Sequence, residues 1–237
     1  MSTTEGFRYF LTIVDDFTRA TWVYLLKSKD EVYDSFTSFF HVLLNQFDSK
    51  IKIVRSDNGT EFLNRKMETF LNLNGIIHQT TCVYTPQQNG VVERKHRHIL
   101  NVARSLLFQS GLPIKYWGEA VLTSVFLINR MPTSVLKGQS PYELVLKKMP
   151  VFDHIRVFGS LCFATKLNNL DKFSERAEKC VLLGYSSEKK GYKLLSLDTN
   201  SVFVSMDVKF YESVFPFKFK STAIDNQFVF RDSVDLF

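Results

Sequence analysis

Residues 54–62 of this chain read Val-Arg-Ser-Asp-Asn-Gly-Thr-Glu-Phe, and residues 85–94 read Thr-Pro-Gln-Gln-Asn-Gly-Val-Val-Glu-Arg. The first stretch ends an alternating, strand-like segment in Asp57, and the second places Glu93 where a helical pattern begins. Each acid alone is typical of a solvated turn or of a helix N-terminus. Together they are a stronger signal, because two carboxylates at the edge of a sheet can hold Mg²⁺ for phosphoryl transfer on nucleic acid. Asp57 and Glu93 are therefore the predicted catalytic and metal-binding residues.

The bulk composition is that of an ordinary globular protein. The chain has 237 residues, of which 45% are hydrophobic and 23% charged, and this length suffices for one sizeable core and a small second unit. We expect no membrane span, because no apolar run is long enough, and an intracellular protein, because the N-terminus lacks the apolar stretch of a signal peptide. Three widely spaced cysteines argue against a disulfide framework and against structural zinc.

Positive charge gathers around the two acids. Residues 51–150 carry 13 Lys and Arg against 6 Asp and Glu, although the whole chain has a net charge of only +6. Such a region attracts phosphates, but it can equally be a solvated basic face. Glu93 and Arg97 lie four residues apart on one helix face, where a surface salt bridge is the alternative to a functional role. The predicted nucleic-acid contacts are Gln88, Asn89, Arg94, Lys95 and Arg97.

The first 150 residues alternate between strand and helix patterns. Strands are expected at residues 8–16, 21–26, 50–55 and 76–81. Helices are expected after Ser28, with an apolar stripe from Val32 to Phe47, and at about residues 91–108 and 115–129. Ser28 is the expected N-cap of the first helix, with Glu31 completing a capping box, and Asn64 is expected to open a short helix. A last short helix should begin at Ser140-Pro141-Tyr142-Glu143.

The composition changes near Pro150. Strand patterns follow at residues 156–165, 178–185, 191–197, 201–209 and 210–214. Short strands in such quick succession favour a small barrel. We therefore expect domains at residues 1–150 and 155–217, followed by an irregular tail at residues 218–237.

Several motifs resemble those of one enzyme family. Residues 56–62 and 85–94 resemble the second and third acidic motifs of DDE integrases. Residues 116–120, 129–132, 140–143 and 155–159 resemble the copia-type retrotransposon branch of that family. The resemblance runs from about Gly6 to Phe217. It implies an α/β RNase H-like core, with a mixed sheet flanked by helices, followed by a small SH3-like β-barrel.

The resemblance also implies an activity and its partners. Family members join element ends to target DNA by metal-dependent strand transfer, in which a 3′-hydroxyl attacks a target phosphodiester and two Mg²⁺ or Mn²⁺ ions stabilise the reacting oxygens. By motif match, Asp57 and Glu93 are the second and third metal ligands. The expected partner is DNA, the expected assembly is a homo-oligomer of the full-length form, and the expected site of action is the nucleus.

One departure from the family pattern concerns the first metal ligand. In the family this Asp lies in an Asp-x-x-Gly-Pro context on a strand upstream of the Arg8-Tyr9-Phe10 strand, and residues 1–7 contain no Asp. We therefore expect an incomplete triad, weakly bound metal, a missing first strand, and an inactive fragment of a longer polyprotein. Asp15 and Asp16 are possible substitutes. The alternative functions are a non-catalytic nucleic-acid-binding remnant or interaction module and, less favoured, an RNase H-like nuclease.

Overall fold

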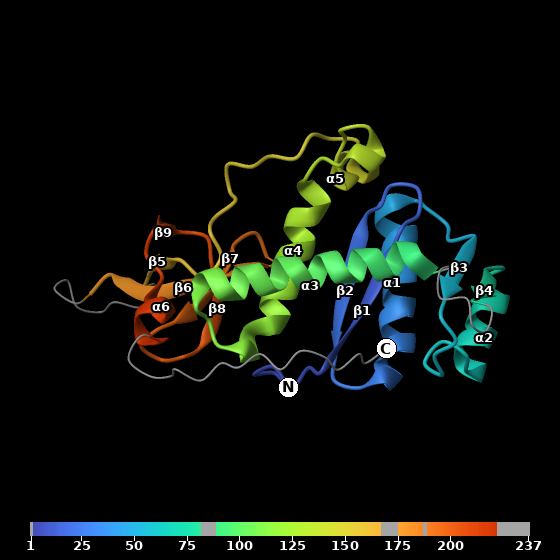
Figure 1. Ribbon diagram of the computed structural model, residues 1–237, viewed down its shortest axis with the longest axis horizontal. Helices are drawn as coiled ribbons and strands as arrows, with labels where there is room; N and C mark the ends of the chain where they lie inside the picture. Colours follow the sequence, from blue (N-terminus) through green and yellow to red (C-terminus); the bar gives the residue numbers. More distant parts are fainter. Residues whose placement is uncertain (1, 82–88, 167–174, 187–188, 222–237) are drawn as a thin grey trace. The chain divides into compact units, whose positions relative to one another are not determined.

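The chain folds into two compact units. The computed structural model describes residues 2–81, 89–166, 175–186 and 189–221 (Figure 1). The first unit comprises Met1–Arg104 and Ile114–His154, and the second comprises Ser105–Pro113 and Ile155–Phe237. One long helix, α3, contributes residues to both units.

The first unit alternates between strands and helices, as the hydrophobic periodicity predicts. Its strands are β1 (Tyr9–Val14), β2 (Thr21–Leu26), β3 (Ile53–Ser56) and β4 (Ile77–Thr80). Its α-helices are α1 (Val32–Phe47), α2 (Arg65–Leu73), α3 (Gly90–Ser110), α4 (Trp117–Arg130) and α5 (Pro141–Leu146). Short 3-10 turns lie at Lys29–Glu31, Ile114–Tyr116 and Ser134–Leu136.

The strands of the first unit form two pairs. β1 and β2 are antiparallel, with Tyr9 opposite Leu26 and Val14 opposite Thr21. β3 and β4 are parallel, with Ile53 beside Ile77. Both kinds of pairing that a mixed sheet requires are therefore present, but among the described residues they are divided between two separate two-stranded sheets.

A single hydrophobic core joins these two sheets. Its buried members come from β1, β2, α1 and α2 and from the residue that precedes β4: Leu11, Leu26, Val32, Phe36, Phe40, Met67, Leu71 and Ile76. Phe70 of α2 meets Phe36 and Phe40 of α1 edge-on, with ring centroids 6.2 and 5.2 Å apart. This core fixes α2, and with it the segment that follows β3, against the β1–β2 hairpin.

Two of the three predicted helix caps are present in the structure, and the third is not. The Asn64 side chain accepts a hydrogen bond from the Met67 N–H, and Ser140 forms a full capping box with Glu143. The predicted box at Ser28 is wrong, because the Ser28 side chain makes no capping bond and the Glu31 carboxylate accepts instead from the Lys27 N–H, 2.8 Å away. A 3-10 turn before α1 accounts for this shift by one residue.

The second unit contains one antiparallel sheet. Its strands are β5 (Leu161–Thr165), β6 (Ala177–Tyr185), β7 (Tyr192–Ser196), β8 (Val202–Ser205) and β9 (Val208–Tyr211), in the order β8-β7-β6-β5-β9. Cys162 and Cys180 lie opposite each other on β5 and β6. Both are fully buried, and burial raises the pKa of each thiol to about 12, so they pack as small apolar residues.

Three predictions for this unit are corrected by the structure. Residues 156–160 precede β5 rather than belonging to it. The expected strand at residues 201–209 is broken at Met206 and Asp207 into β8 and β9, which pair with opposite edges of the sheet. The segment expected to be irregular begins with a short helix, α6 (Pro216–Ser221), and Pro is favoured at the first helical position.

Asn129 fastens α4 to the β1–β2 hairpin. Its side-chain oxygen accepts from the Thr21 N–H at 3.0 Å, and its amide nitrogen donates to the Thr21 carbonyl oxygen at 2.7 Å. Thr21 is 1% exposed, so these two backbone groups have little access to water. One side chain therefore satisfies both polar groups of a buried residue at the start of β2.

Replacing Asn129 should destabilise the first unit. We expect Asn129→Ala to lower the free energy of unfolding by about 1–3 kcal/mol, because it leaves a buried N–H and C=O of Thr21 without hydrogen-bond partners. Urea unfolding followed by circular dichroism measures the loss. Asn72→Ala, on the exposed part of α2, is the matched control and should change stability by less than about 0.5 kcal/mol. Equal unfolding curves for the Asn129 and Asn72 variants would contradict the role given to Asn129.

Candidate nucleic-acid-processing site

Asp57 directly follows β3 and is exposed. Its turn is held to the neighbouring strand, because the Asn58 side chain donates a hydrogen bond to the Thr81 carbonyl oxygen at 3.0 Å. The Gly59 N–H donates to Oδ1 of Asp57 at 3.1 Å, which orients the carboxylate over its own turn. Among the described residues Asp57 has no salt bridge. Its carboxylate is therefore oriented but not neutralised.

Gly59 lies close to two acidic side chains of its own loop. A Cβ at this position would lie 2.6 Å from Oε2 of Glu61 and 3.0 Å from Oδ1 of Asp57. The space that glycine leaves is therefore taken by two carboxylate side chains of the same loop. Glu61 was not identified from the sequence as part of the site. It is largely buried, and Lys29 pairs with it at 3.2 Å, so its charge is already balanced.

Glu93 lies in the first turn of α3, on an exposed position where the helix dipole favours a negative charge. The face of α3 next to Glu93 packs on β1. The His96 ring stacks on Phe10 with a centroid distance of 4.6 Å, and Nδ1 of His96 lies 3.2 Å from the Thr12 hydroxyl. Ile99, one turn further along, is fully buried. This buried face fixes the rotation of the helix and turns Glu93 toward solvent.

The predicted basic contacts differ in their surroundings. Arg94 and Arg97 are exposed, and in the described part of the chain no salt bridge joins Arg97 to Glu93, so the alternative of a helix-surface pair is not formed. Nη1 of Arg94 lies 3.0 Å from the position that a Cβ of Gly90 would occupy, so this guanidinium covers the start of the helix. Asn89 precedes α3, whereas Gln88 lies outside the described residues.

Lys95 has a neighbour that the sequence did not reveal. Burial, and then the positive charge of Arg19, lower the pKa of Lys95. Arg19 sits in the turn between β1 and β2 and pairs with Asp16 at 2.7 Å. Arg19 thus already has an acidic partner, and its remaining repulsion of Lys95 makes the charged form of Lys95 less favourable.

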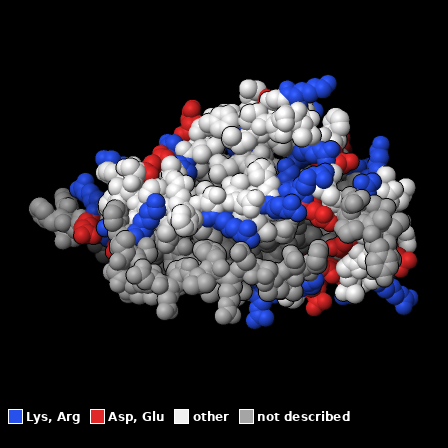
Figure 2. All heavy atoms as spheres, in the orientation of Figure 1, with Lys and Arg blue, Asp and Glu red and all other residues white. Residues whose placement is uncertain are grey.

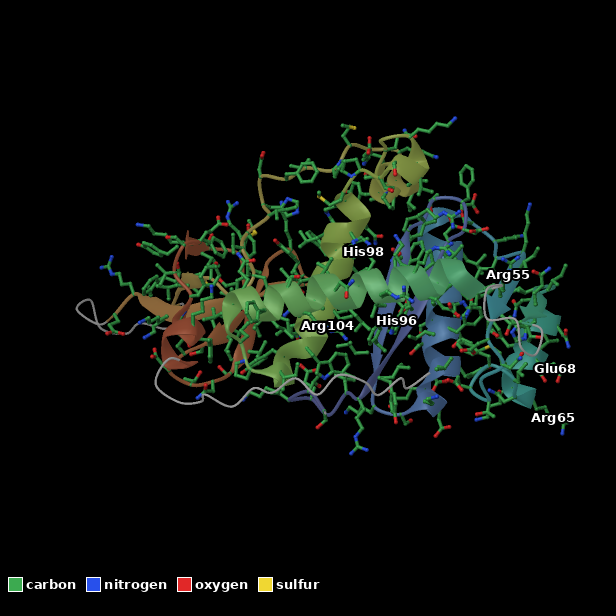
Figure 3. All side chains as sticks on the ribbon, viewed as in Figure 1. Arg55, Arg65, Glu68, His96, His98 and Arg104 are labelled. Carbon is green, nitrogen blue, oxygen red and sulfur yellow. The ribbon has the colours of Figure 1, made fainter. Side chains whose placement is uncertain are left out.

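Further polar side chains extend the exposed face of α3. Figure 2 shows Lys and Arg side chains along the part of this face where α3 runs. His98 and Arg104 are exposed on the same helix and are labelled in Figure 3. Neither was singled out from the sequence, although their helical spacing from Arg94 and Arg97 could have indicated them. The basic surface of α3 therefore continues for several turns beyond Glu93.

Asp15 and Asp16 serve the turn between β1 and β2. Oδ2 of Asp15 accepts from the Thr18 N–H at 2.8 Å and from the Thr18 hydroxyl at 2.6 Å. Oδ1 of Asp16 accepts from Arg19 at 2.7 Å. Both acids thus carry contacts that stabilise the hairpin, and Arg19 adopts a positive φ of 59° within it. Their surroundings are those of structural turn acids.

None of the described helices is long and apolar enough to cross a membrane. Over the same residues, no group of three or more His, Cys, Asp or Glu is arranged to hold a metal ion. Asp57 and Glu93 remain the two exposed acids that the sequence placed at element ends.

Two family models match separate parts of the chain. The model described as "Integrase core domain" matches residues 1–86, and the one described as "Retroviral polymerase SH3-like domain" matches residues 160–223. The fold is therefore an RNase H-like integrase core followed by an SH3-like domain, which confirms the fold class expected from the sequence.

Curated relatives are similar over most of the chain. It is 39% identical over 214 residues to the retrovirus-related Pol polyprotein from transposon RE1 of Arabidopsis thaliana, which covers 90% of this chain and 14% of the polyprotein. It is 39% identical over 209 residues to the polyprotein from transposon TNT 1-94 of Nicotiana tabacum, covering 88% of this chain and 16% of that protein. The truncated transposon Ty1-A Gag-Pol polyprotein of Saccharomyces cerevisiae is 34% identical over 78% of this chain and 16% of its own length. The chain therefore spans about a seventh of these relatives.

Solved integrase cores resemble it more distantly. The HTLV-2 integrase catalytic core domain in complex with magnesium has 22% identity and a TM-score of 0.43, over 56% of this chain and 80% of that one. The BIV integrase catalytic core domain has 20% identity and a TM-score of 0.45, over 58% and 85% of the two chains. The family assignment rests on the sequence relatives and the family models.

These findings define the class as integrases with an SH3-like domain after the catalytic core. Within that class, the chain belongs to the copia-type family of LTR-retrotransposon integrases, which confirms the resemblance seen in its motifs.

The contact of α3 with β1 should make stability depend on pH. Burial lowers the pKa of His96 below its ordinary value of 6.5. As pH falls, the unfolded chain therefore takes up this proton first, so the free energy of unfolding should decrease below about pH 6.5. His96→Phe preserves a stacking ring without the titration, and should show a smaller decrease in urea unfolding between pH 7 and pH 5.

The expected difference is specific to His96. His98→Phe, on the exposed face of the same helix, is the matched control and should follow the wild-type pH profile. A residual decrease is expected in all three proteins, since burial also lowers the pKa of His78. Identical pH profiles for the His96 variant and the wild type would contradict this account.

Proposed function

We propose that this chain is the catalytic and SH3-like portion of a retrotransposon integrase that joins element DNA to target DNA. The observation that carries the proposal is the 39% identity to a Pol polyprotein over 90% of the chain, together with the "Integrase core domain" match. The placement of Asp57 after a strand and of Glu93 in the first turn of a helix supports it. In the reaction, a new P–O bond forms to the element 3′ oxygen while the target P–O3′ bond breaks. The proton lost by the attacking hydroxyl is balanced by the one that the leaving oxygen gains.

Asp57 and Glu93 would hold the divalent metal. Both are exposed carboxylates without an ion pair among the described residues, and oxygen donors of this kind suit Mg²⁺ or Mn²⁺. Mg²⁺ is commonly bound by one or two carboxylates, its remaining positions being filled by water and substrate phosphates. When bound, the metal would stabilise the attacking and leaving oxygens of the phosphodiester exchange. The HTLV-2 core in complex with magnesium supports this choice of cation.

The basic residues of α3 would hold the DNA backbone. Arg94 and Arg97 are exposed donors beside Glu93, and Lys95 lies between them in the sequence. Asn89 and Gln88 would contact the nucleic acid just before the helix. We further propose that the full-length form acts as a homo-oligomer, as expected from the sequence, and that it works in the nucleus, where chromosomal target DNA lies.

The isolated 237-residue polypeptide is proposed to be inactive in joining. Two-metal phosphoryl transfer in this family uses three acids, and the motifs supply two. Asp15 and Asp16 are already engaged with Thr18 and Arg19, which weighs against their use as the third. The same observation favours the second candidate function, a non-catalytic nucleic-acid-binding module.

A joining assay separates these functions. With a short donor duplex and Mg²⁺ or Mn²⁺, the 237-residue polypeptide should give no product, whereas a longer polypeptide that adds an Asp-x-x-Gly-Pro segment upstream should join DNA. In that longer protein, Asp57→Asn or Glu93→Gln should reduce joining by about a hundredfold or more, because each removes a group that stabilises reaction charge. Glu68→Gln, at an exposed acid of α2 (Figure 3), is the control. Efficient joining by the shorter polypeptide would refute the three-acid argument.

DNA binding should persist in the isolated polypeptide and should weaken steeply with salt. If Arg94 and Arg97 each contact a phosphate, Arg94→Gln or Arg97→Gln should reduce the slope of log Kd against log salt by roughly one unit. Fluorescence anisotropy with a labelled duplex measures this slope. Arg65→Gln, at an exposed position of α2, is the matched control and should leave the slope unchanged. Unchanged slopes for all three variants would place the DNA contact elsewhere.

A further inference from the structure

A hydrogen-bonded chain leads from β4 to the backbone of Asp57. Nε2 of His78 lies 2.9 Å from the Ser56 hydroxyl oxygen, and that hydroxyl lies 2.8 Å from the carbonyl oxygen of Asp57. The parallel register places His78 beside Val54 and Thr80 beside Ser56. His78 therefore reaches diagonally across the pair of strands to the last residue of β3.

The direction of these bonds follows from the number of protons. A serine hydroxyl has one hydrogen, and here it is donated to the Asp57 carbonyl oxygen. The bond between Ser56 and His78 must then be donated by Nε2–H of the imidazole. Both the neutral Nε2–H tautomer and the imidazolium carry this proton, so the bond does not depend on the charge of His78.

The burial of Ser56 keeps this chain of hydrogen bonds in place. Ser56 is 5% exposed, so its hydroxyl cannot readily exchange its partners for water. The Asp57 carbonyl belongs to the peptide that enters the Asn58-Gly59 turn, and fixing it fixes the direction in which the chain leaves β3. The Gly59 N–H then orients the Asp57 carboxylate, and Asn58 ties the far side of the turn to Thr81.

We propose that His78 is a positioning residue for the carboxylate of Asp57. Through Ser56 it holds the first peptide of the turn, and the turn holds the carboxylate at a fixed angle to the end of β3. The role in metal binding rests on the proposed function, in which Asp57 is a metal ligand. The role in ordering the turn does not depend on it.

The first test needs no metal. In the 237-residue chain, His78→Leu should raise the amide exchange rate of Gly59 about fivefold, because loss of one hydrogen bond loosens the turn whose N–H reports on the Asp57 carboxylate. His78→Gln offers an N–H at the place of Nε2 and should restore slow exchange, whereas Ser56→Ala should match His78→Leu. His41→Leu, at an exposed position of α1, is the control. NMR of the wild-type imidazole should show a proton on Nε2.

The second test measures Mn²⁺ binding by water proton relaxation. His78→Leu should weaken the affinity about tenfold, the lower end of the range for groups that orient a metal ligand, and His78→Gln should retain it. Thermal melting of each variant accompanies the titration. A purely structural role would lower the melting temperature of His78→Gln and His78→Leu alike without separating their affinities, and that result would overturn the proposal.

The two tests fail in different ways. If Asp57→Asn leaves Mn²⁺ binding unchanged, the proposed metal ligand is wrong, and Gly59 exchange alone then decides the positioning role. If Gly59 exchanges equally fast in wild type and His78→Leu, the positioning role is wrong whatever the metal does. If His78→Leu does not fold, the contrast between Ser56→Ala and the wild type gives the same decision.

Discussion

The stacking of His96 on Phe10 is the contact on which the arrangement of α3 depends. The two rings are nearly parallel, at 4°, and the Thr12 hydroxyl adds a polar contact at the edge of the imidazole. A helix can roll on a sheet unless something fixes its rotation, and a flat ring on a flat ring with one directional bond does so. With His96 and Ile99 turned inward, the 3.6-residue period turns Arg94 and Arg97 outward, and it leaves Glu93 beside the buried face at an exposed position. The electrostatic character of the exposed face is thus a consequence of the buried one.

The turn after β3 orients an exposed acid, Asp57, without a partner of opposite charge. It does so with backbone and neutral side chains: the Gly59 N–H, the Asn58 amide and the Ser56 hydroxyl. A lysine or arginine would orient the carboxylate more strongly, but it would also neutralise the charge. Glu61, a few residues on, shows that alternative, since its carboxylate is paired with Lys29. The same loop therefore contains one acid used for structure and one left available.

The sequence predicted the helix caps and helices that are determined by residues close together in the chain. Asn64 and the Ser140-Glu143 pair were recognised as caps because the donor and acceptor lie within one turn of chain. The helical spacing of apolar residues predicted α1, α3 and α4. The break at Met206 and Asp207 was missed because β-rich sequence runs straight through it, and only pairing with opposite sheet edges separates β8 from β9. Ser28 failed as a cap for a related reason: a 3-10 turn moved the start of the helix.

The candidate site likewise contains residues that local motifs identified and contacts that they could not identify. Asp57 and Glu93 could be named from their motifs, but the closeness of Arg19 to Lys95 and of Glu61 to Gly59 depends on tertiary packing, which no spacing rule encodes. The β1–β2 turn shows why the position of an acid in the sequence does not tell whether its side chain is available to a ligand. Asp15 and Asp16 look available in the sequence, yet withdrawing Asp15 toward a metal would leave the Thr18 N–H and hydroxyl without their acceptor in a tight turn. An acid that already satisfies two donors can become a ligand only by giving up part of the fold, so the hairpin and the metal compete for it. Asp57 faces no such competition, because the one bond its carboxylate accepts from Gly59 leaves its second oxygen free of any bond within the described residues.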